Sequence, residues 1–319
     1  MKRLWQVREF STLMILALEV AFFTWYLWPD NGGHPFLNVG NGLLILKYSS
    51  IYGIAAIGAA IVIITGGIDL SSGAVIGLTS VVTGYFFVQG QWSLTASALM
   101  GLMVGLSAGL ASSWLIVGMR LPPFIATLGV MGIWRGAGYI ITEARFYDLS
   151  ARLPRNWTVM GVSIDWVPPM VMVVLAGIFQ LLMKRFQWGR AVFAVGGNEM
   201  AALFSGLRVG MVKTSAYVAA GLLASISGVV LAVVQGQGKA DLANGYELDI
   251  IASAVVGGTS LTGGRGSVAG AVLGALIFGV LRNALPQIPG ATFYDRVIVG
   301  LAVIGIVVMD QVMVRKGQA

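Results

Sequence analysis

The sequence contains no cysteine and only one histidine, His34. It therefore has no disulfide bond, no thiolate nucleophile and no thiolate metal site. It also lacks an HExxH motif, a histidine partner for a catalytic serine, and a group of acids at the spacing of metal ligands. We therefore expect a protein that is not an enzyme and that binds no cofactor or metal of its own.

Charged residues are also scarce, at 10% of the 319 residues, whereas soluble domains have roughly 25%. Hydrophobic residues make up 57%, and a membrane-spanning helix needs roughly 20 consecutive, mostly apolar residues. The apolar runs that are long enough cover about 11–28, 43–65, 70–88, 93–117, 124–142, 165–183, 214–235, 248–262, 267–285 and 293–313. We therefore predict an all-α integral membrane protein with about ten transmembrane helices, folded as a single transmembrane domain over residues 1–319.

The basic residues are unevenly distributed between the two sides of these spans. If both termini are cytoplasmic, twelve Lys and Arg lie on their side of the membrane and six on the other. The positive-inside rule predicts a bias of this kind. The basic segment 184–213 then faces the cytoplasm, while 143–164 and 236–247 face the opposite side. The net charge of +7 thus reflects topology, and we expect no nucleic-acid partner.

The shortest predicted span, 248–262, is interrupted by the pair Gly257-Gly258. A re-entrant segment is the alternative, but it leaves nine spans and moves the basic C-terminal residues to the outside. Counted from Tyr246 to Thr262, the segment has seventeen residues, or about 25 Å of helix. We therefore keep it as a full span.

Two glycine-rich segments share one pattern, a glycine pair followed by polar residues. They read GGIDLSSG at 66–73 and GGTSLTGG at 257–264. Interrupted helices in the two halves of a transporter can mark the substrate path, and ordinary glycine-rich turns at a membrane face are the alternative. The candidate caps are Asp69, Ser71 and Ser72 for the helix that follows the first segment, and Ser260, Thr262 and Ser267 for the helix that follows the second. The path candidates are Gly66, Gly67, Asp69, Ser71, Thr127, Arg135, Gly257, Gly258 and Thr259.

The remaining charged residues near the spans have simpler interpretations. Arg282 and Asp310 lie near predicted span ends and are expected to reach the membrane interface. Arg135 lies deeper, where a carboxylate or carbonyl partner on another helix is the favoured explanation. Three acids, Asp241, Glu247 and Asp249, gather at the outer loop around the start of 248–262. We interpret them as a solvated surface.

Four longer motifs contain these segments in a fixed order. They read GGIDLSSG at 66–73, PPFIATLGVMGIWRG at 122–136, GRAVFAVGGNEMAALFSGLRV at 189–209, and GYELDIIASAVVGGTSLTGGRGSVAG at 245–270. Together they resemble the permease subunits of ribose/galactose-type monosaccharide ABC importers, which are proteins of the bacterial inner membrane. The resemblance covers about 60–310, nearly the whole chain.

The resemblance implies an ABC importer permease fold with three kinds of partner besides the lipid bilayer. These are a second permease copy or a paralogue, a periplasmic solute-binding protein that delivers a monosaccharide, and an ATP-binding cassette subunit that holds ATP and Mg. It also implies that the loop at about 187–212 couples the chain to that subunit. Within the loop, Asn198 is expected to cap a short helix over 199–205, which Gly206 ends. The coupling candidates are Gly196, Gly197, Asn198, Glu199, Ala202 and Gly206.

Other functions stay open from the sequence alone. The solute of such a permease could instead be a branched-chain amino acid, a nucleoside or a furanone signal. From a different class, the chain could be an ion-coupled carrier or channel that needs no ATPase. The sequence contains no series of intramembrane acids and histidines for a proton relay, which argues against a proton-driven carrier.

Overall fold

The computed structural model describes residues 2–28, 36–143, 145–153, 158–159 and 162–290, and the single positions 294, 297, 300, 301, 304 and 305. The described part is almost entirely helical, with two short β-ribbons. Eight of its helices are long and apolar enough to cross a membrane. This confirms the predicted all-α membrane protein. The predicted span 293–313 lies outside the described residues, apart from isolated positions, as do His34 and Asp310.

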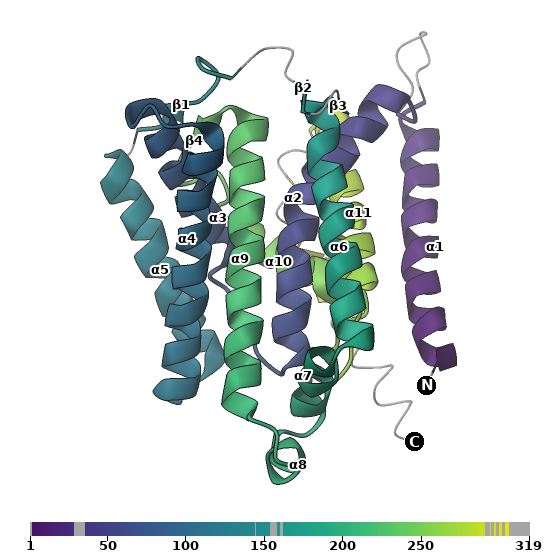
Figure 1. The fold of residues 1–319 in the computed structure, drawn as a ribbon. Coiled ribbons are helices and arrows are strands. Elements are labelled where there is room, and N and C mark those ends of the chain that lie inside the picture. The colour runs from purple at the N-terminus through teal and green to yellow at the C-terminus, as the bar shows by residue number, and fades with distance from the viewer. Residues whose placement is uncertain are drawn as a thin grey trace.

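The long helices form one bundle (Figure 1). They are α1 (Lys2–Tyr26), α2 (Val39–Ile64), α3 (Ser72–Gly84), α4 (Leu94–Ser113), α5 (Pro123–Thr142), α6 (Val167–Arg185), α9 (Val209–Gln235) and α11 (Val268–Ala284). Three shorter helices are α7 (Gln187–Gly197), α8 (Glu199–Phe204) and α10 (Tyr246–Val256). The π-helical turns η1 (Tyr85–Gln89) and η2 (Trp114–Gly118) extend α3 and α4, while the 3-10 turns η3 (Ile164–Trp166) and η4 (Leu285–Gln287) precede α6 and follow α11.

Helix α2 lies at the centre of the bundle. Every residue from Ser49 to Ile64 is buried, and α2 packs against α6, α9, α10 and α11. Small residues bring the helix backbones close together. A Cβ on Gly58 would lie 2.7 Å from the Ala220 Cα of α9, and one on Gly109 of α4 would lie 2.6 Å from the Tyr217 carbonyl oxygen. Close packing between apolar helices thus accounts for much of the glycine content.

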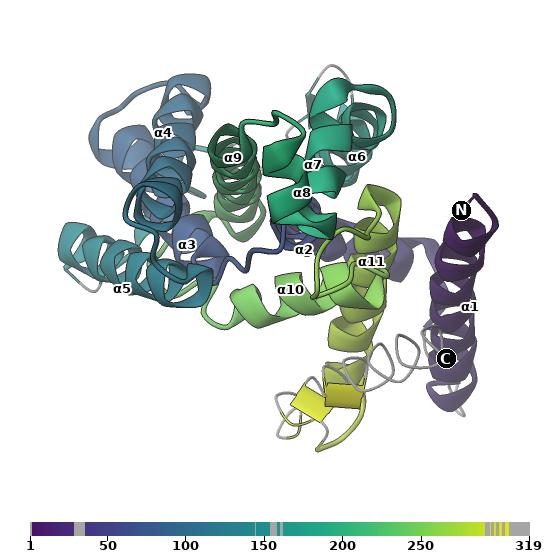
Figure 2. The ribbon, with the colours of Figure 1, turned by 90° about the horizontal axis from the view of Figure 1, so that it is seen from below.

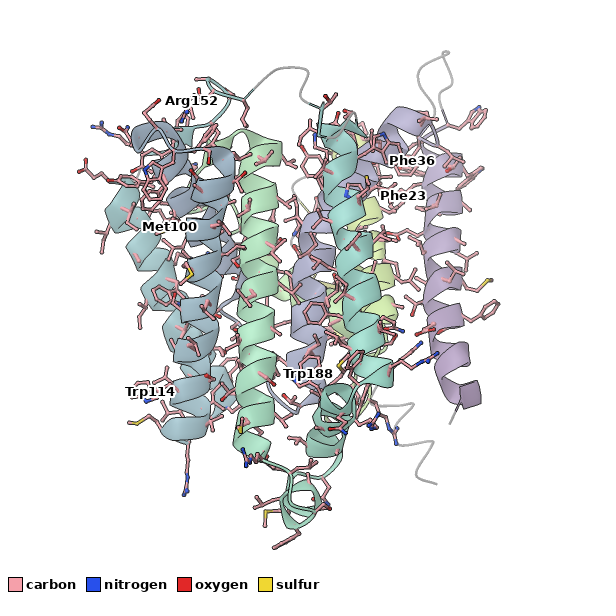
Figure 3. All side chains as sticks on the ribbon, in the orientation of Figure 1. Phe23, Phe36, Met100, Trp114, Arg152 and Trp188 are labelled. Carbon is pink, nitrogen blue, oxygen red and sulfur yellow. The ribbon has the colours of Figure 1, made fainter. Side chains whose placement is uncertain are left out.

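The two ends of the bundle differ in structure. The start of α1 and the helices α7 and α8 lie at one end, which we call the α7–α8 end (Figure 1). At the opposite end, the ribbon end, β1 (Tyr147–Asp148) pairs with β4 (Gln237–Gly238), and β2 (Thr158–Val159) pairs with β3 (Val162–Ser163). Trp114 and Trp188 lie towards the α7–α8 end and Arg152 lies at the ribbon end (Figure 3). The predicted separation of 184–213 from 143–164 is therefore confirmed.

The predicted helix over 248–262 is wrong. The helix α10 has 11 residues, or about 16 Å of length, against the ~30 Å of a bilayer core. It runs obliquely across the bundle (Figure 2). Non-helical segments at 239–245 and 257–267 complete the passage from β4 at the ribbon end to the end of α2 at the α7–α8 end. Irregular backbone is tolerated at such depth because protein encloses it.

Candidate functional site

The predicted coupling segment folds as two short helices at the α7–α8 end. Asn198 separates them, and its Oδ1 accepts a hydrogen bond of 2.9 Å from the Ala201 amide in α8. Glu199 in the first turn of α8 pairs with Lys213 of α9, with 2.7 Å between Oε2 and Nζ. The chain then turns at Gly206, which has a φ of 82°. The capped helix is thus confirmed, one residue shorter than predicted.

Helix α8 presents apolar side chains away from the protein. Its Ala202 is buried against α7 and α9, whereas Met200, Leu203 and Phe204 are exposed, Phe204 by 83%. These three residues share one helix face, because they stand at i, i+3 and i+4. An exposed apolar patch indicates a contact surface, for another protein or for the membrane. The sequence analysis missed all three residues, although their spacing in the 199–205 helix could have identified them.

Backbones from three separate segments meet where α7 ends. A Cβ on Gly196 would overlap the Ile64 carbonyl oxygen of α2 and would lie 2.7 Å from the Gly264 amide nitrogen. That amide donates a hydrogen bond of 2.9 Å to the same carbonyl. A Cβ on Gly263 would lie 2.8 Å from the Gly196 carbonyl oxygen and 3.2 Å from Gly66. We call these five residues, Ile64, Gly66, Gly196, Gly263 and Gly264, the glycine junction.

The glycine junction separates two residues that the sequence analysis grouped together. Gly196 faces inward and contacts both predicted breaks, whereas nothing lies within 4 Å of a Cβ on Gly197. Both backbones approach Gly264, but only at Gly196 would an added side chain point into the bundle.

The break between α2 and α3 is held by side-chain hydrogen bonds. Asp69 Oδ1 accepts from the Ser71 amide at 2.8 Å and from the Ser71 hydroxyl at 2.6 Å. Thr127 of α5 accepts a bond of 3.2 Å from the Leu70 amide. A side chain on Gly67 would overlap the Tyr217 hydroxyl. Ser71 makes no side-chain cap bond to α3, so its predicted cap is wrong, because its hydroxyl donates to Asp69 instead.

The break between α10 and α11 is equally compact. A Cβ on Gly257 would overlap Gly270 of α11, and Gly258 has a left-handed φ of 90°. Thr259 is buried. Ser267 Oγ accepts a bond of 3.3 Å from the Gly270 amide and caps α11 as predicted. Six path candidates of the two breaks and α5 are buried, namely Gly67, Asp69, Ser71, Thr127, Gly257 and Thr259, while Gly66, Gly258 and Arg135 retain exposed surface.

Arg135 has the carboxylate partner that its depth predicts. Its Nη2 lies 3.4 Å from Glu247 Oε2, and its Nη1 donates to Asn244 Oδ1. Asn244 belongs to the segment that leads into α10, and Glu247 to the first turn of α10.

Arg282 keeps 31% of its side-chain surface, and its position at the membrane interface stays a prediction. The prediction for Asp249 is wrong, because Asp249 is only 1% exposed instead of solvated and pairs with Arg282 at 2.6 Å. The reason is that the chain enters the bundle directly after β4. The first turn of α10 therefore lies inside the bundle. The Ser80 hydroxyl of α3 donates a bond of 3.1 Å to the Lys239 carbonyl, and Ala243 is 1% exposed. Within the predicted outer loop 236–247, Ala240 and Ala243 are therefore buried, while Lys239 and Asp241 keep 40% and 39% of their side-chain surface and Asn244 is exposed.

The segment at β1, the other part of the ribbon end, stays at the surface at Asp148 and Ser150. The Ser150 hydroxyl and amide donate to Asp148 Oδ1 at 2.5 and 2.9 Å. These bonds lower the pKa of the exposed Asp148 carboxyl below its usual value. The ribbon end thus carries a fixed negative charge at neutral pH.

Known proteins resemble the chain over nearly its whole length. The sequence profile described as branched-chain amino acid transport system / permease component matches residues 42–307. The ribose import permease protein of Bacillus subtilis is 35% identical over 281 residues, 86% of each chain. The D-allose transport system permease protein of Escherichia coli is 32% identical over 306 residues, 96% of this chain and 92% of the relative. The fructose import permease protein of Rhizobium meliloti is 32% identical over 308 residues, 94% and 84% of the two chains.

Proposed function

The chain belongs to the branched-chain amino acid transport system / permease component family, and from this premise we propose that it is the membrane subunit of an ATP-driven monosaccharide importer. A permease of this kind is a non-catalytic, multi-pass membrane subunit of a bacterial ABC importer. The names of the three relatives, which refer to ribose, D-allose and fructose, support a monosaccharide as the solute. The chain then acts as one transmembrane domain over 1–319.

The α7–α8 helix pair is the contact for the ATP-binding cassette subunit, which holds ATP and Mg. One observation carries this assignment. The helix α8 exposes Met200, Leu203 and Phe204, and the helix before it ends at the glycine junction. A displacement of α8 would therefore reach both breaks through contacts between backbones, which deform less easily than side chains.

The α7–α8 end and both termini face the cytoplasm in this proposal. Four basic residues between the last turn of α6 and the start of α9 are exposed, and in the described part of the chain none of them pairs with an acid, namely Lys184, Arg185, Arg190 and Arg208. Uncompensated basic residues favour the cytoplasmic side. The ribbon end then receives the periplasmic solute-binding protein, and a second permease copy or a paralogue completes the assembly.

The breaks 65–71 and 257–267 are the moving parts next to the substrate path. The path candidates that are buried in these breaks, such as Asp69 and Thr259, would then stabilise the conformation of the two segments. Movement of the junction would open the path.

Reconstitution of the complete complex tests the proposal. The permease, its ATP-binding subunit and its solute-binding protein are placed in proteoliposomes, and ATP-dependent uptake of D-ribose, D-allose and D-fructose is measured beside L-leucine. We expect uptake of at least one sugar and none of leucine. Leucine uptake without sugar uptake would show that the protein imports amino acids instead. Uptake of any of these solutes without the ATP-binding subunit would indicate an independent carrier.

A further inference from the structure

The motif GYELD at 245–249 forms the first turn of α10. The proposed coupling through α7 and α8 does not involve this motif. The neighbouring helices α2 and α11 contact it. Tyr246 packs against Tyr52 of α2, with 4.6 Å between ring centroids. Asp249, which is 1% exposed, pairs with Arg282 of α11. These two contacts hold the Tyr246 and Asp249 sides of the turn against α2 and α11.

Glu247 has different surroundings. The 3.4 Å between its Oε2 and Arg135 Nη2 exceeds the distance of about 2.7–2.9 Å of a tight charge-assisted hydrogen bond. The Arg135 Nε has no partner among the described residues. The Arg135 and Glu247 side chains retain 18% and 13% of their surface, and Asn244 is exposed. The three residues therefore form a polar cluster with unused hydrogen-bonding capacity.

The α5 backbone is uncovered at two glycines close to Arg135. Gly132 and Gly136 lie three residues before and one residue after it, and no atom lies within 4 Å of a Cβ on either glycine. A small ligand could therefore approach the α5 backbone closely. A cluster of charged residues within spanning helices faces a cavity or another protein and not the lipid. This surface therefore borders water or a second chain.

The cluster lies between the ribbon end and the glycine junction. Arg135 stands seven residues before Thr142, where α5 ends towards β1, which is about 10 Å along the helix. The segment to Asn244 enters the bundle from β4 on the same side. In Figure 2, α5 and α10 lie along one face of the bundle. The cluster therefore lies on the ribbon-end side of the glycine junction.

We propose that Arg135, Asn244 and Glu247 form a hydroxyl-binding site for the transported solute, which is a neutral polyol. The guanidinium supplies a planar pair of donors, the carboxylate supplies acceptors, and the amide supplies both. Adjacent hydroxyl groups each donate and accept, so they can bridge the pair. The two charges already neutralise each other, so an amino acid zwitterion would first have to separate them. This inference rests on the proposed importer function.

A cysteine beside the cluster tests the site directly, because the chain has no native cysteine. Gly132→Cys is placed in the complete complex and treated with a water-soluble maleimide. We expect labelling, and we expect D-ribose with the loaded binding protein and ATP to slow it at least about threefold, as partial occupancy would. Labelling of the exposed neighbour Ile133→Cys should not respond to sugar. D-Allose and D-fructose replace ribose if they are the transported sugars.

Substitutions within the cluster separate binding from a merely structural role. In Glu247→Gln and Arg135→Lys, sugar imported per ATP hydrolysed should fall at least about fivefold, an effect of the order of one lost hydrogen bond. ATP hydrolysis stimulated by the binding protein should remain, because α7 and α8 are unchanged. Asp165→Asn, which alters the ion pair with Lys47, should change neither quantity.

Three results would overturn the site. They are the absence of Gly132→Cys labelling, labelling that sugar does not slow, or labelling that L-leucine slows instead. Glu247→Gln could instead lower the midpoint of thermal unfolding and leave the ratio of sugar imported to ATP hydrolysed unchanged. That result would mean that the Arg135–Glu247 pair only stabilises the position of α10. Failure of the importer function itself is distinguishable, because the wild-type complex would then import no sugar.

Discussion

At the scale of single residues, Gly196 and Gly197 are neighbours with opposite surroundings. A methyl group on Gly196 meets the Ile64 carbonyl oxygen, whereas one on Gly197 meets open space. Overpacking against backbone costs about 1–3 kcal/mol. We expect Gly196→Ala to lower ATP-driven uptake by about tenfold, which corresponds to ~1.4 kcal/mol. The matched variant Gly197→Ala should transport normally. Equal activity of the two variants would remove the glycine junction from the coupling route.

Phe204 is the residue that we expect to anchor the ATP-binding subunit. It is 83% exposed, and a large apolar side chain buried at an interface contributes about 2 kcal/mol or more. Phe204→Ser should therefore weaken the affinity of the purified permease for that subunit by about 30-fold. Phe146→Ser provides the control, because Phe146 is also exposed but precedes β1 at the ribbon end. Unchanged binding of Phe204→Ser in a titration would show that another surface makes the contact.

At the scale of elements, α10 depends on partners from three other helices. Its 11 residues are too few for an independently stable helix, since isolated helices shorter than about 12–15 residues are marginal in water. The segments before and after it are non-helical, and its first turn contacts Tyr52, Arg135 and Arg282. The element is therefore stable only in its tertiary context.

The ion pair of α10 gives a prediction for stability. Asp249→Asn removes the carboxylate partner of Arg282, whose side chain is 31% exposed, so the loss should stay below the ~3–5 kcal/mol of a fully buried pair. We expect a clearly lower midpoint of thermal unfolding in detergent. The double variant Asp249→Asn/Arg282→Met should recover part of the loss. The variant Asp165→Asn should stay closer to wild type, because the Asp165 side chain is 42% exposed and its pair with Lys47 is therefore partly solvated. An unchanged midpoint in Asp249→Asn would mean that the pair contributes little.

At the scale of the whole molecule, the orientation in the membrane can be read with single cysteines. Arg152→Cys at the ribbon end should react with an impermeant maleimide in intact cells. Met200→Cys in α8 should react only after the membrane is opened. Ala243→Cys should stay unlabelled in both conditions, because Ala243 is buried beside α3. Labelling of position 200 in intact cells would invert the orientation and contradict the assignment of the ATP-binding subunit.

The sequence by itself determined the class of the protein and most of its helices. Seven predicted spans, from 11–28 to 214–235, and the span 267–285 correspond to described helices. Long apolar runs determine these helices, because hydropathy and the need to satisfy backbone hydrogen bonds leave no other structure in lipid. The cap at Asn198 was also predictable, because a cap depends on neighbouring residues only. The family motifs indicated the importer class, to which the chain belongs.

Only the tertiary structure decided what surrounds α10 and the breaks. Asp249 and Arg282 are 33 residues apart in sequence, and no local pattern shows that they pair. The inward direction of Gly196 depends on where α2 and the 257–267 segment lie. The tilt of α10 likewise follows from the path of 239–245 along α3. Contacts between distant segments set burial and pairing, so periodicity and composition, which report local preference, could not supply them.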